Sequence, residues 1–166
     1  NNIWGNTAPA TSGAFYFPTG AAWLCQDLWE IYAYNQDKDF LKENYNTMLQ
    51  AALFWVDNLV VDTRDNTLVS SPSWSPEHGS YSLGTANDQG IIWDLFENVI
   101  EASEALGYNT SEVQEIKEAQ QRLSGPKIGL AGEYLEWKDE QENDLDGDAS
   151  SSGETHRHTN QLFALH

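Results

Sequence analysis

The sequence predicts an all-α domain. Apolar residues recur with helical spacing in four segments, and little of the chain shows the alternation of a half-buried strand. Hydrophobic residues make up 40% of the 166-residue chain and charged residues 20%, so the chain can bury a core rather than stay disordered. A chain of this length forms one ordinary domain, and no internal repeat is evident.

The first helix is expected over residues 21–34, where the apolar stripe is wide. A stripe of this width indicates a helix that is buried on more than one side. Cys25, the only cysteine, lies within it and is expected to be a buried thiol. A single cysteine also excludes an internal disulfide framework and a multi-cysteine zinc site. The stripe comprises Ala21, Ala22, Leu24, Cys25, Leu28, Trp29, Ile31 and Tyr32.

Three more helices follow from the same periodicity. The second is expected over residues 37–61 and the third over residues 88–106, with Gly107 placed to end the third. The fourth is expected over residues 111–123, opened by a capping box that begins at Ser111. Apolar positions that define the second and third helices include Phe40, Leu41, Met48, Trp55, Leu59, Ile91, Ile92, Leu95, Phe96 and Val99.

Two polar segments interrupt or follow the helices. Residues 70–87 contain two Ser-Pro pairs, and residues 138–155 form an acidic loop that is expected to be mobile. The whole chain is acidic, because 26 Asp and Glu against 8 Lys and Arg give a net charge of −18. That balance argues against a nucleic acid or an anionic membrane as partner. No apolar run reaches the roughly 18–20 residues of a membrane helix.

No metal site is predicted, although two segments offer suitable ligand types. His156 and His158 with one acidic residue would supply three zinc ligands, but no established zinc spacing supports them. Residues 144–148 resemble the start of a calcium loop, which requires Gly at its sixth position and a carboxylate at its twelfth. Those positions hold Ala149 and Thr155, so a solvated acidic loop containing Asp144, Asp146 and Asp148 is the preferred interpretation.

Glu77 is the first candidate for chemistry. It lies in Ser-Pro-Ser-Trp-Ser-Pro-Glu-His-Gly, residues 71–79, where two prolines restrict the backbone on either side of Trp74. A carboxyl group held beside an aromatic ring can have a raised pKa, which suits a general acid. An ordinary exposed glutamate in a proline-rich turn fits the same pattern, and this alternative stays open.

The triplet His-Arg-His, residues 156–158, is the second candidate. Arg157 offers several fixed donors for hydroxyl or carboxylate groups, whereas pairing with the adjacent acidic loop is the alternative. Tryptophans give a third signal, because indole rings suit flat apolar sugar faces. Trp29, Trp55 and Trp93 lie in helical stripes and are expected in the core. The tryptophans expected in loops or at a helix start, where they could face a ligand, are Trp4, Trp23, Trp74 and Trp137.

Six segments carry a resemblance to a known family. They include Asn-Ile-Trp-Gly-Asn-Thr-Ala-Pro at residues 2–9, Pro-Thr-Gly-Ala-Ala-Trp-Leu at residues 18–24 and Glu-Trp at residues 136–137. With residues 71–79, 88–96 and 156–158, they resemble ordered landmarks of the glycoside hydrolase family 95 α-L-fucosidases. The resemblance implies an (α/α)6 toroid with long loops, an inverting mechanism and terminal α-1,2-linked fucose as substrate. Some family members instead prefer α-L-galactosides.

The resemblance also implies roles for seven residues. Glu77 matches the general acid, and Arg157 and His158 match residues that hold the sugar's hydroxyl groups. The family's base is an asparagine polarised by an aspartate, and both are expected to lie outside residues 1–166. Residues 159–162, Thr-Asn-Gln-Leu, depart from the Val-Ser-His-Leu expected there. The remaining four residues would line the pocket: Trp23, Trp74, Glu136 and Trp137.

Residues 1–166 are therefore expected to be a fragment of a single glycoside hydrolase catalytic domain, secreted or extracellular, and inactive alone. No cofactor is implied, because protonation and water attack need none. The expected partners are a fucosylated oligosaccharide or glycan and the remainder of the same catalytic domain. One alternative is a non-catalytic carbohydrate-binding or structural helical module, which would not need a rigidly held Glu77. Another is a toroid hydrolase that acts on α-L-galactosides.

Overall fold

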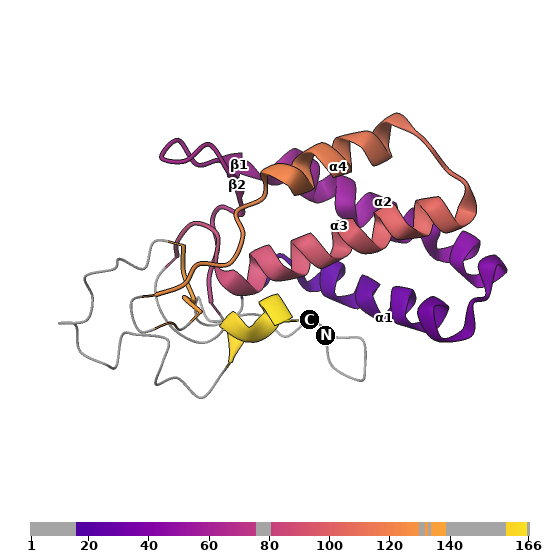
Figure 1. Ribbon diagram of the computed structural model, residues 1–166, viewed down its shortest axis with the longest axis horizontal. Helices are drawn as coiled ribbons and strands as arrows, with labels where there is room; N and C mark the ends of the chain where they lie inside the picture. Colours follow the sequence, from indigo (N-terminus) through magenta and orange to yellow (C-terminus); the bar gives the residue numbers. More distant parts are fainter. Residues whose placement is uncertain (1–15, 76–80, 130–131, 133, 139–158, 166) are drawn as a thin grey trace.

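The computed structural model describes residues 16–75, 81–129, 132, 134–138 and 159–165. This part of the chain is mostly helical, as the sequence predicts (Figure 1). The elements, in chain order, are α1 (Gly20–Asn35), α2 (Lys38–Asn58), β1 (Val60–Val61), β2 (Leu68–Val69), α3 (Ala86–Leu106), α4 (Ser111–Arg122) and the 3₁₀ helix η4 (Asn160–Leu165).

Helix α3 lies at the centre of the bundle and packs against α1, α2, α4 and η4. Its buried side is apolar over more than two turns, which is the pattern expected of a core helix. Five of its side chains are almost wholly buried: Ile91, Ile92, Leu95, Phe96 and Val99. They meet Leu41 and Met48 of α2 and Ile116 of α4 in one continuous core. The core therefore fixes four helices relative to one another.

Helix boundaries differ from the expected ones where capping or strand pairing decides them. The second helix ends at Asn58 rather than at residue 61, because Val60 and Val61 pair with Val69 and Leu68 in a two-stranded antiparallel ladder. The β-branched side chains of both valines favour that extended backbone. The third helix begins two residues earlier than expected.

Two cap predictions have opposite outcomes. Gly107 ends α3 in the left-handed conformation with φ of 73°, which confirms the expected stop. The capping box at Ser111 is wrong, because Ser111 is already helical and the N-cap is Thr110, which makes no side-chain capping hydrogen bond. By contrast, the Asp37 carboxylate accepts from the backbone N–H groups of Asp39 and Phe40 at the start of α2.

Helix α1 exposes more apolar surface than its stripe predicts. Cys25 is buried, as expected, and burial raises the pKa of its thiol. Leu24, however, is 70% exposed, and Ile31 and Tyr34 are also exposed. Trp93 of α3 is 50% exposed, so the expectation that it lies in the core is wrong for the described part of the chain. Large apolar side chains that are exposed to this extent mark a surface that another part of the protein can cover.

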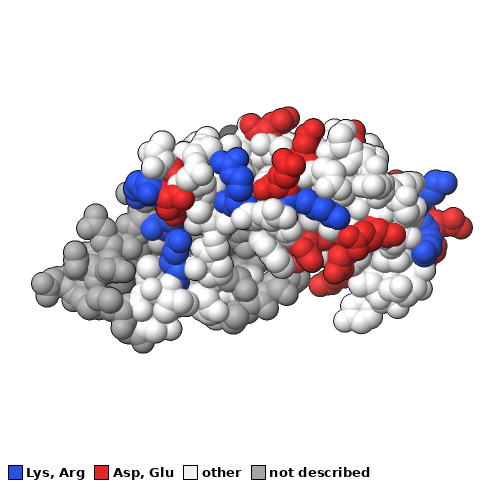
Figure 2. Space-filling model, turned by 45° about the horizontal axis from the view of Figure 1, so that its top comes forward, with Lys and Arg blue, Asp and Glu red and all other residues white. Residues whose placement is uncertain are grey.

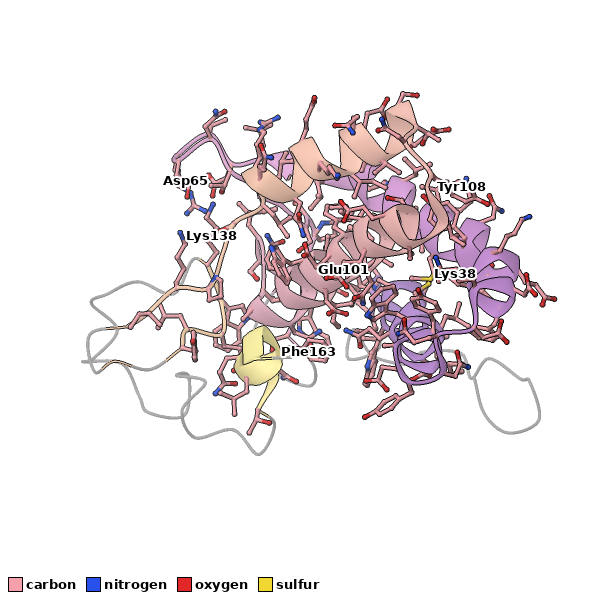
Figure 3. The ribbon with its side chains drawn as sticks, turned by 45° about the vertical axis from the view of Figure 1, so that its right-hand side comes forward. Lys38, Asp65, Glu101, Tyr108, Lys138 and Phe163 are labelled. Carbon is pink, nitrogen blue, oxygen red and sulfur yellow. The ribbon has the colours of Figure 1, made fainter. Side chains whose placement is uncertain are left out.

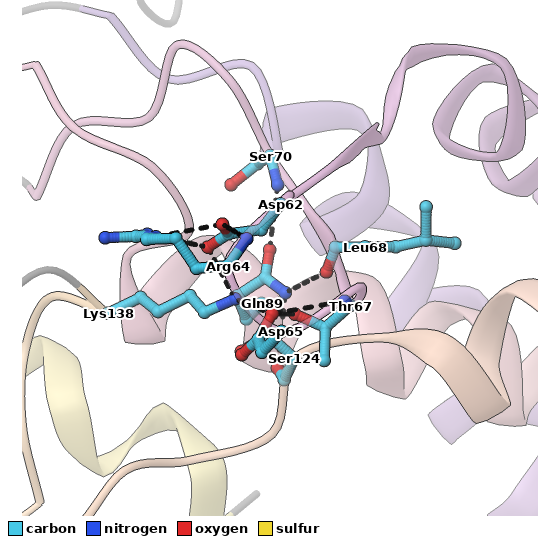
Figure 4. Close-up of polar contacts among 9 residues, drawn as sticks. All are labelled: Asp62, Arg64, Asp65, Thr67, Leu68, Ser70, Gln89, Ser124 and Lys138. Carbon is cyan, nitrogen blue, oxygen red and sulfur yellow. Dashed lines mark hydrogen bonds and ion pairs between the residues drawn. The ribbon is translucent and has the colours of Figure 1, made fainter.

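A short polar cluster ties the β1–β2 hairpin to residue 138 (Figures 3 and 4). The Lys138 ammonium lies 2.8 Å from Asp62 Oδ2 and 2.9 Å from Asp65 Oδ1, and it donates to the Thr67 hydroxyl. The Arg64 guanidinium lies 2.6 Å from the same Asp62 oxygen. Hydrogen bonds from Arg64 and Lys138 hold the pKa of Asp62 far below its usual range, and Lys138 lowers that of Asp65 to about 2.

This cluster makes stability pH-dependent in acid. Because both carboxyl pKa values are lowered by folding, their contribution is present above about pH 4, the unfolded value, and is lost as the pH falls toward 2. Lys138→Met in the full-length protein is expected to lower the urea midpoint at pH 7 and to flatten its decline between pH 4 and pH 2. The matched control is Lys117→Met, which breaks a more exposed pair with Glu104 and should change little. Parallel pH curves for Lys138→Met and the parent protein would contradict this assignment.

Charge on the described surface is mixed. On the face in Figure 2, acidic and basic side chains are interspersed, and the described residues of that face form no broad basic patch. No helix within the described residues is long and apolar enough to cross a membrane.

Candidate functional site

The N-terminal ends of α1 and α3 lie together, and the loop of residues 70–75 reaches the same end (Figure 1). The hydroxyl of Thr19, the N-cap of α1, donates to Asp88 Oδ1 at 3.0 Å. Asp88 lies in the first turn of α3, where the helix dipole favours a negative charge. Residues 18–24 and 88–96 and the described part of residues 71–79, three segments singled out from the sequence, therefore meet here.

A hydrogen-bond chain joins the loop to α3 through Asp88. The Ser73 hydroxyl donates to Asp88 Oδ2 at 2.6 Å and accepts from the backbone N–H of Thr85 at 3.0 Å. The Thr85 hydroxyl lies 2.8 Å from the same Ser73 oxygen. Asp88 is 0% exposed, and desolvation raises the pKa of its carboxyl group against the opposing effect of these hydroxyl donors.

A second buried carboxylate joins three separate segments. The Ser75 hydroxyl donates to Glu136, and the Asn160 amide donates both to the Ser75 oxygen at 3.1 Å and to Glu136 Oε1 at 3.3 Å. Glu136 is 1% exposed and Ser75 is 0% exposed. The Ser75–Glu136–Asn160 junction thus connects the loop before α3, the segment after α4 and the start of η4.

Backbone contacts hold the same segments together. The backbone N–H of Ala86 donates to the Glu136 carbonyl at 2.9 Å, and that of Lys138 donates to the Gly84 carbonyl at 3.3 Å. Ser73 and Ser82 exchange two backbone hydrogen bonds of 2.9 and 2.8 Å across the loop. Residues 136–138 therefore run beside the start of α3. The two backbone hydrogen bonds between Ser73 and Ser82 hold together the described ends of the segment between them.

A cavity of about 270 Å³ lies on the other side of residues 136–138. Leu135, Trp137 and Lys138 line it, whereas the Glu136 side chain belongs to the Ser75–Glu136–Asn160 junction. Trp93 of α3 and Phe163 of η4 complete an aromatic wall, and Figure 3 shows Phe163 beside α3. Asp94 on the cavity's edge accepts from the amides of Gln26 at 2.7 Å and Asn98 at 2.9 Å.

The structure places four of the seven site residues expected from the sequence. Trp23 is 51% exposed on the first turn of α1 and makes edge-to-face ring contacts with Phe17 and Phe163. Trp74 is buried, Glu136 is buried in the junction, and Trp137 lines the cavity. Phe163 thus links Trp23 to the cavity that Trp137 lines. The other three, Glu77, Arg157 and His158, lie outside the described residues.

Apart from Glu136, the buried polar residues of the site were missed by sequence reasoning. Thr85 and Asp88 carry a detectable signal, because Thr-x-x-Asp before an apolar run is a helix-start pattern, and the Thr85 hydroxyl accepts from the Asp88 backbone N–H. Ser73, Ser75 and Asn160 carry none, since a serine or asparagine in a polar loop is unremarkable until its distant partner is known. Among the described residues, no group of three or more His, Cys, Asp or Glu is arranged to hold a metal ion.

Comparisons with known proteins agree on one family. Residues 1–166 match the glycosyl hydrolase family 95 catalytic domain. The chain is 32% identical over 177 residues to alpha-L-fucosidase 2 of Arabidopsis thaliana, covering 99% of this chain and 20% of that protein. It is 34% identical over 172 residues to probable alpha-fucosidase A of Aspergillus niger, covering 98% of this chain and 21% of that protein. The chain therefore spans about a fifth of the length of these relatives.

Proposed function

Because the chain belongs to glycosyl hydrolase family 95, within the catalytic domain, we propose that its full-length protein removes terminal α-L-fucose from glycans. Similarity to alpha-L-fucosidase 2 and alpha-fucosidase A over nearly the whole chain supports this substrate class. The finer proposal is that the linkage is α-1,2 and that hydrolysis inverts the anomeric configuration. A toroid hydrolase acting on α-L-galactosides is the competing specificity.

The observation that supports this proposal most is the Ser75–Glu136–Asn160 junction. Glu77 follows Ser75 by two residues, and His158 precedes Asn160 by two, while a two-residue stretch spans at most about 7 Å. The hydrogen bond between Ser75 and Asn160 supports the proposal that Glu77 and His158, each two residues from one of its ends, lie near each other. A shared site for an acid and a sugar-holding pair requires such proximity.

In the proposed mechanism, Glu77 protonates the glycosidic oxygen as the bond to the leaving group breaks. Arg157 and His158 hold the hydroxyl groups of the fucose ring, since a guanidinium offers several donors in a fixed plane. An inverting enzyme also needs a base that activates water on the opposite face of the ring. We assign that base, an asparagine polarised by an aspartate, to other parts of the full-length protein.

The aromatic residues are proposed to shape the sugar site. Trp23 presents an exposed indole near Phe163, and an indole face offers an apolar surface with a polar edge. Trp137, which lines the cavity beside Phe163, is proposed to face the sugar, and the buried Trp74 and Glu136 are proposed to form the wall behind it. No cofactor is part of the proposal, because protonation and water attack need none.

The remainder of the catalytic domain is the proposed partner of this chain. In an (α/α)6 toroid, α1 and α3 would belong to the inner ring and α2 and α4 to the outer one. The exposed Leu24 and Ile31 of α1 would then be covered by a neighbouring helix. We propose that residues 1–166 are one part of such a domain and that the protein is secreted or extracellular. Of the expected acidic loop, residues 138–155, only Lys138 is among the described residues, and ion pairs hold its side chain.

The stereochemistry of the first product tests the proposed reaction. Proton NMR during hydrolysis of an α-1,2-fucosylated oligosaccharide by the full-length protein is expected to show β-L-fucose first, before mutarotation. The matching α-L-galactoside should react more slowly. Initial α-L-fucose would contradict inversion, and faster release of L-galactose would favour the competing specificity. Binding of the glycan without any release would favour a non-catalytic module.

A further inference from the structure

Two buried carboxyl groups from different segments accept hydrogen bonds from Ser73 and Ser75, on either side of Trp74 in the loop of residues 70–75. Ser73 donates to Asp88, which lies in the first turn of α3. Ser75 donates to Glu136, which follows α4 in the chain. Trp74, between the two serines, is itself buried. The loop is therefore fixed on both sides of its aromatic residue immediately before it enters the segment that carries Glu77.

Stability alone gives little reason to use carboxylates here. Burying an ionised carboxylate has a large cost in free energy, and the oxygen of a neutral amide would accept from the same serine hydroxyl. The side-chain groups that donate to Asp88, from Thr19 and Ser73, are neutral hydroxyls, and burial raises the pKa of its carboxyl group. What a carboxylate adds is a shorter, stronger hydrogen bond with a fixed direction.

The direction of the hydrogen bonds reinforces this argument. The Ser73 hydroxyl donates to Asp88 Oδ2 and the Thr19 hydroxyl donates to Asp88 Oδ1, so Asp88 accepts at both of its oxygens. The Ser73 oxygen is then free to accept from Thr85, whose backbone N–H lies 3.0 Å away. These contacts fix the orientation of the Ser73 hydroxyl and hold this part of the loop against the start of α3.

We propose that Asp88 and Glu136 act as a pair of positioning residues that hold the loop through Ser73 and Ser75 and so aim the general acid Glu77 at the glycosidic oxygen. The proposal rests on the proposed function of Glu77. It gives Asp88 a role that the sequence did not suggest. It gives Glu136 the role of holding Ser75, in addition to its proposed place in the pocket wall. Neither residue is proposed to transfer a proton.

A positioning role and a merely structural role predict different kinetics. Misplacing an acid by about 1 Å costs on the order of 100-fold in the step that needs it. That loss falls on leaving groups that require protonation and spares an activated aryl leaving group. A structural role would reduce the amount of folded enzyme and would therefore lower the rates on both substrates equally.

The experiment compares Asp88→Asn, Glu136→Gln, Ser73→Ala and Ser75→Ala in the full-length protein. Each is expected to lower kcat on an α-1,2-fucosylated oligosaccharide by about 10- to 100-fold. The loss of kcat on an aryl fucoside should be several times smaller. The carboxylate control is Asp62→Asn, a buried acid of the hairpin. The serine control is Ser103→Ala, a buried hydroxyl in the C-terminal half of α3 that bonds the Ile100 carbonyl. Both controls should lower the two rates alike or not at all.

Hydrogen exchange gives a readout that does not depend on activity. Asp88→Asn and Glu136→Gln should accelerate exchange in peptides covering residues 73–82 and leave the core of α3 unchanged. Asp62→Asn should accelerate exchange only around the hairpin. Acceleration throughout the chain in the first two variants would indicate a structural role and overturn the proposal.

The outcomes separate this proposal from the proposed function. If Glu77→Gln shows the leaving-group dependence but the four loop variants do not, the positioning pair is wrong and the general acid stands. If Glu77→Gln shows no such dependence, the assignment of the acid fails, and the positioning proposal fails with it even where local exchange is accelerated.

Discussion

Glu77→Gln in the full-length protein is expected to slow release of fucose from an α-1,2-linked glycan by about 10²–10⁴-fold. The sugar alcohol that departs is a poor leaving group, so the bond breaks slowly unless its oxygen is protonated. Glutamine keeps the size of the side chain and removes the proton. The loss should appear in kcat, because the substrate still binds.

The same variant should lose much less activity on an aryl fucoside. A phenolate departs with little need of a proton, so the rate of the chemical step depends less on the acid. Steady-state kinetics on both substrates provide the measurement. Equal losses on the two substrates would remove Glu77 from the role of general acid.

Arg157→Ala is expected to lower kcat/KM by about 10- to 100-fold on the natural glycan and on the aryl fucoside alike. The guanidinium is proposed to hold the sugar rather than the leaving group, and hydrogen bonds to a charged donor are worth about 1.5–3 kcal/mol. The nature of the leaving group should therefore not matter.

The matched control for this variant is Arg122→Ala, an exposed arginine in the last turn of α4. Its kcat/KM should be unchanged on both substrates. A loss for Arg157→Ala confined to the natural glycan would place Arg157 at the leaving group and contradict its role as a sugar-holding residue.

The sequence predicted the helical elements well because their apolar periodicity is long and regular. The core residues Ile92 and Phe96 of α3 follow directly from that pattern. The second helix was extended too far, because Val60 and Val61 continue the apolar run while pairing in a strand. That pairing depends on residues 68–69, and periodicity within one segment cannot reveal it.

The candidate site was less predictable, since its buried polar groups gain meaning only from distant partners. Ser75 and Asn160 are 85 positions apart and share a hydrogen bond. Trp93 fits the apolar stripe of α3 yet faces a cavity, because a helix periodicity shows which residues share a face and not what covers that face. The motifs were identified from the resemblance to the family. The structure then shows how the described residues next to those motifs contact one another.

The most direct test of the account is a crystal structure of the full-length Glu77→Gln variant with an α-1,2-fucosylated oligosaccharide. The account predicts that the side chain at position 77 lies about 3 Å from the glycosidic oxygen. It also predicts that Arg157 and His158 bind hydroxyl groups of the same fucose ring, beside the Ser75–Glu136–Asn160 junction. A fucose ring held away from position 77, with neither Arg157 nor His158 bound to its hydroxyl groups, would contradict it.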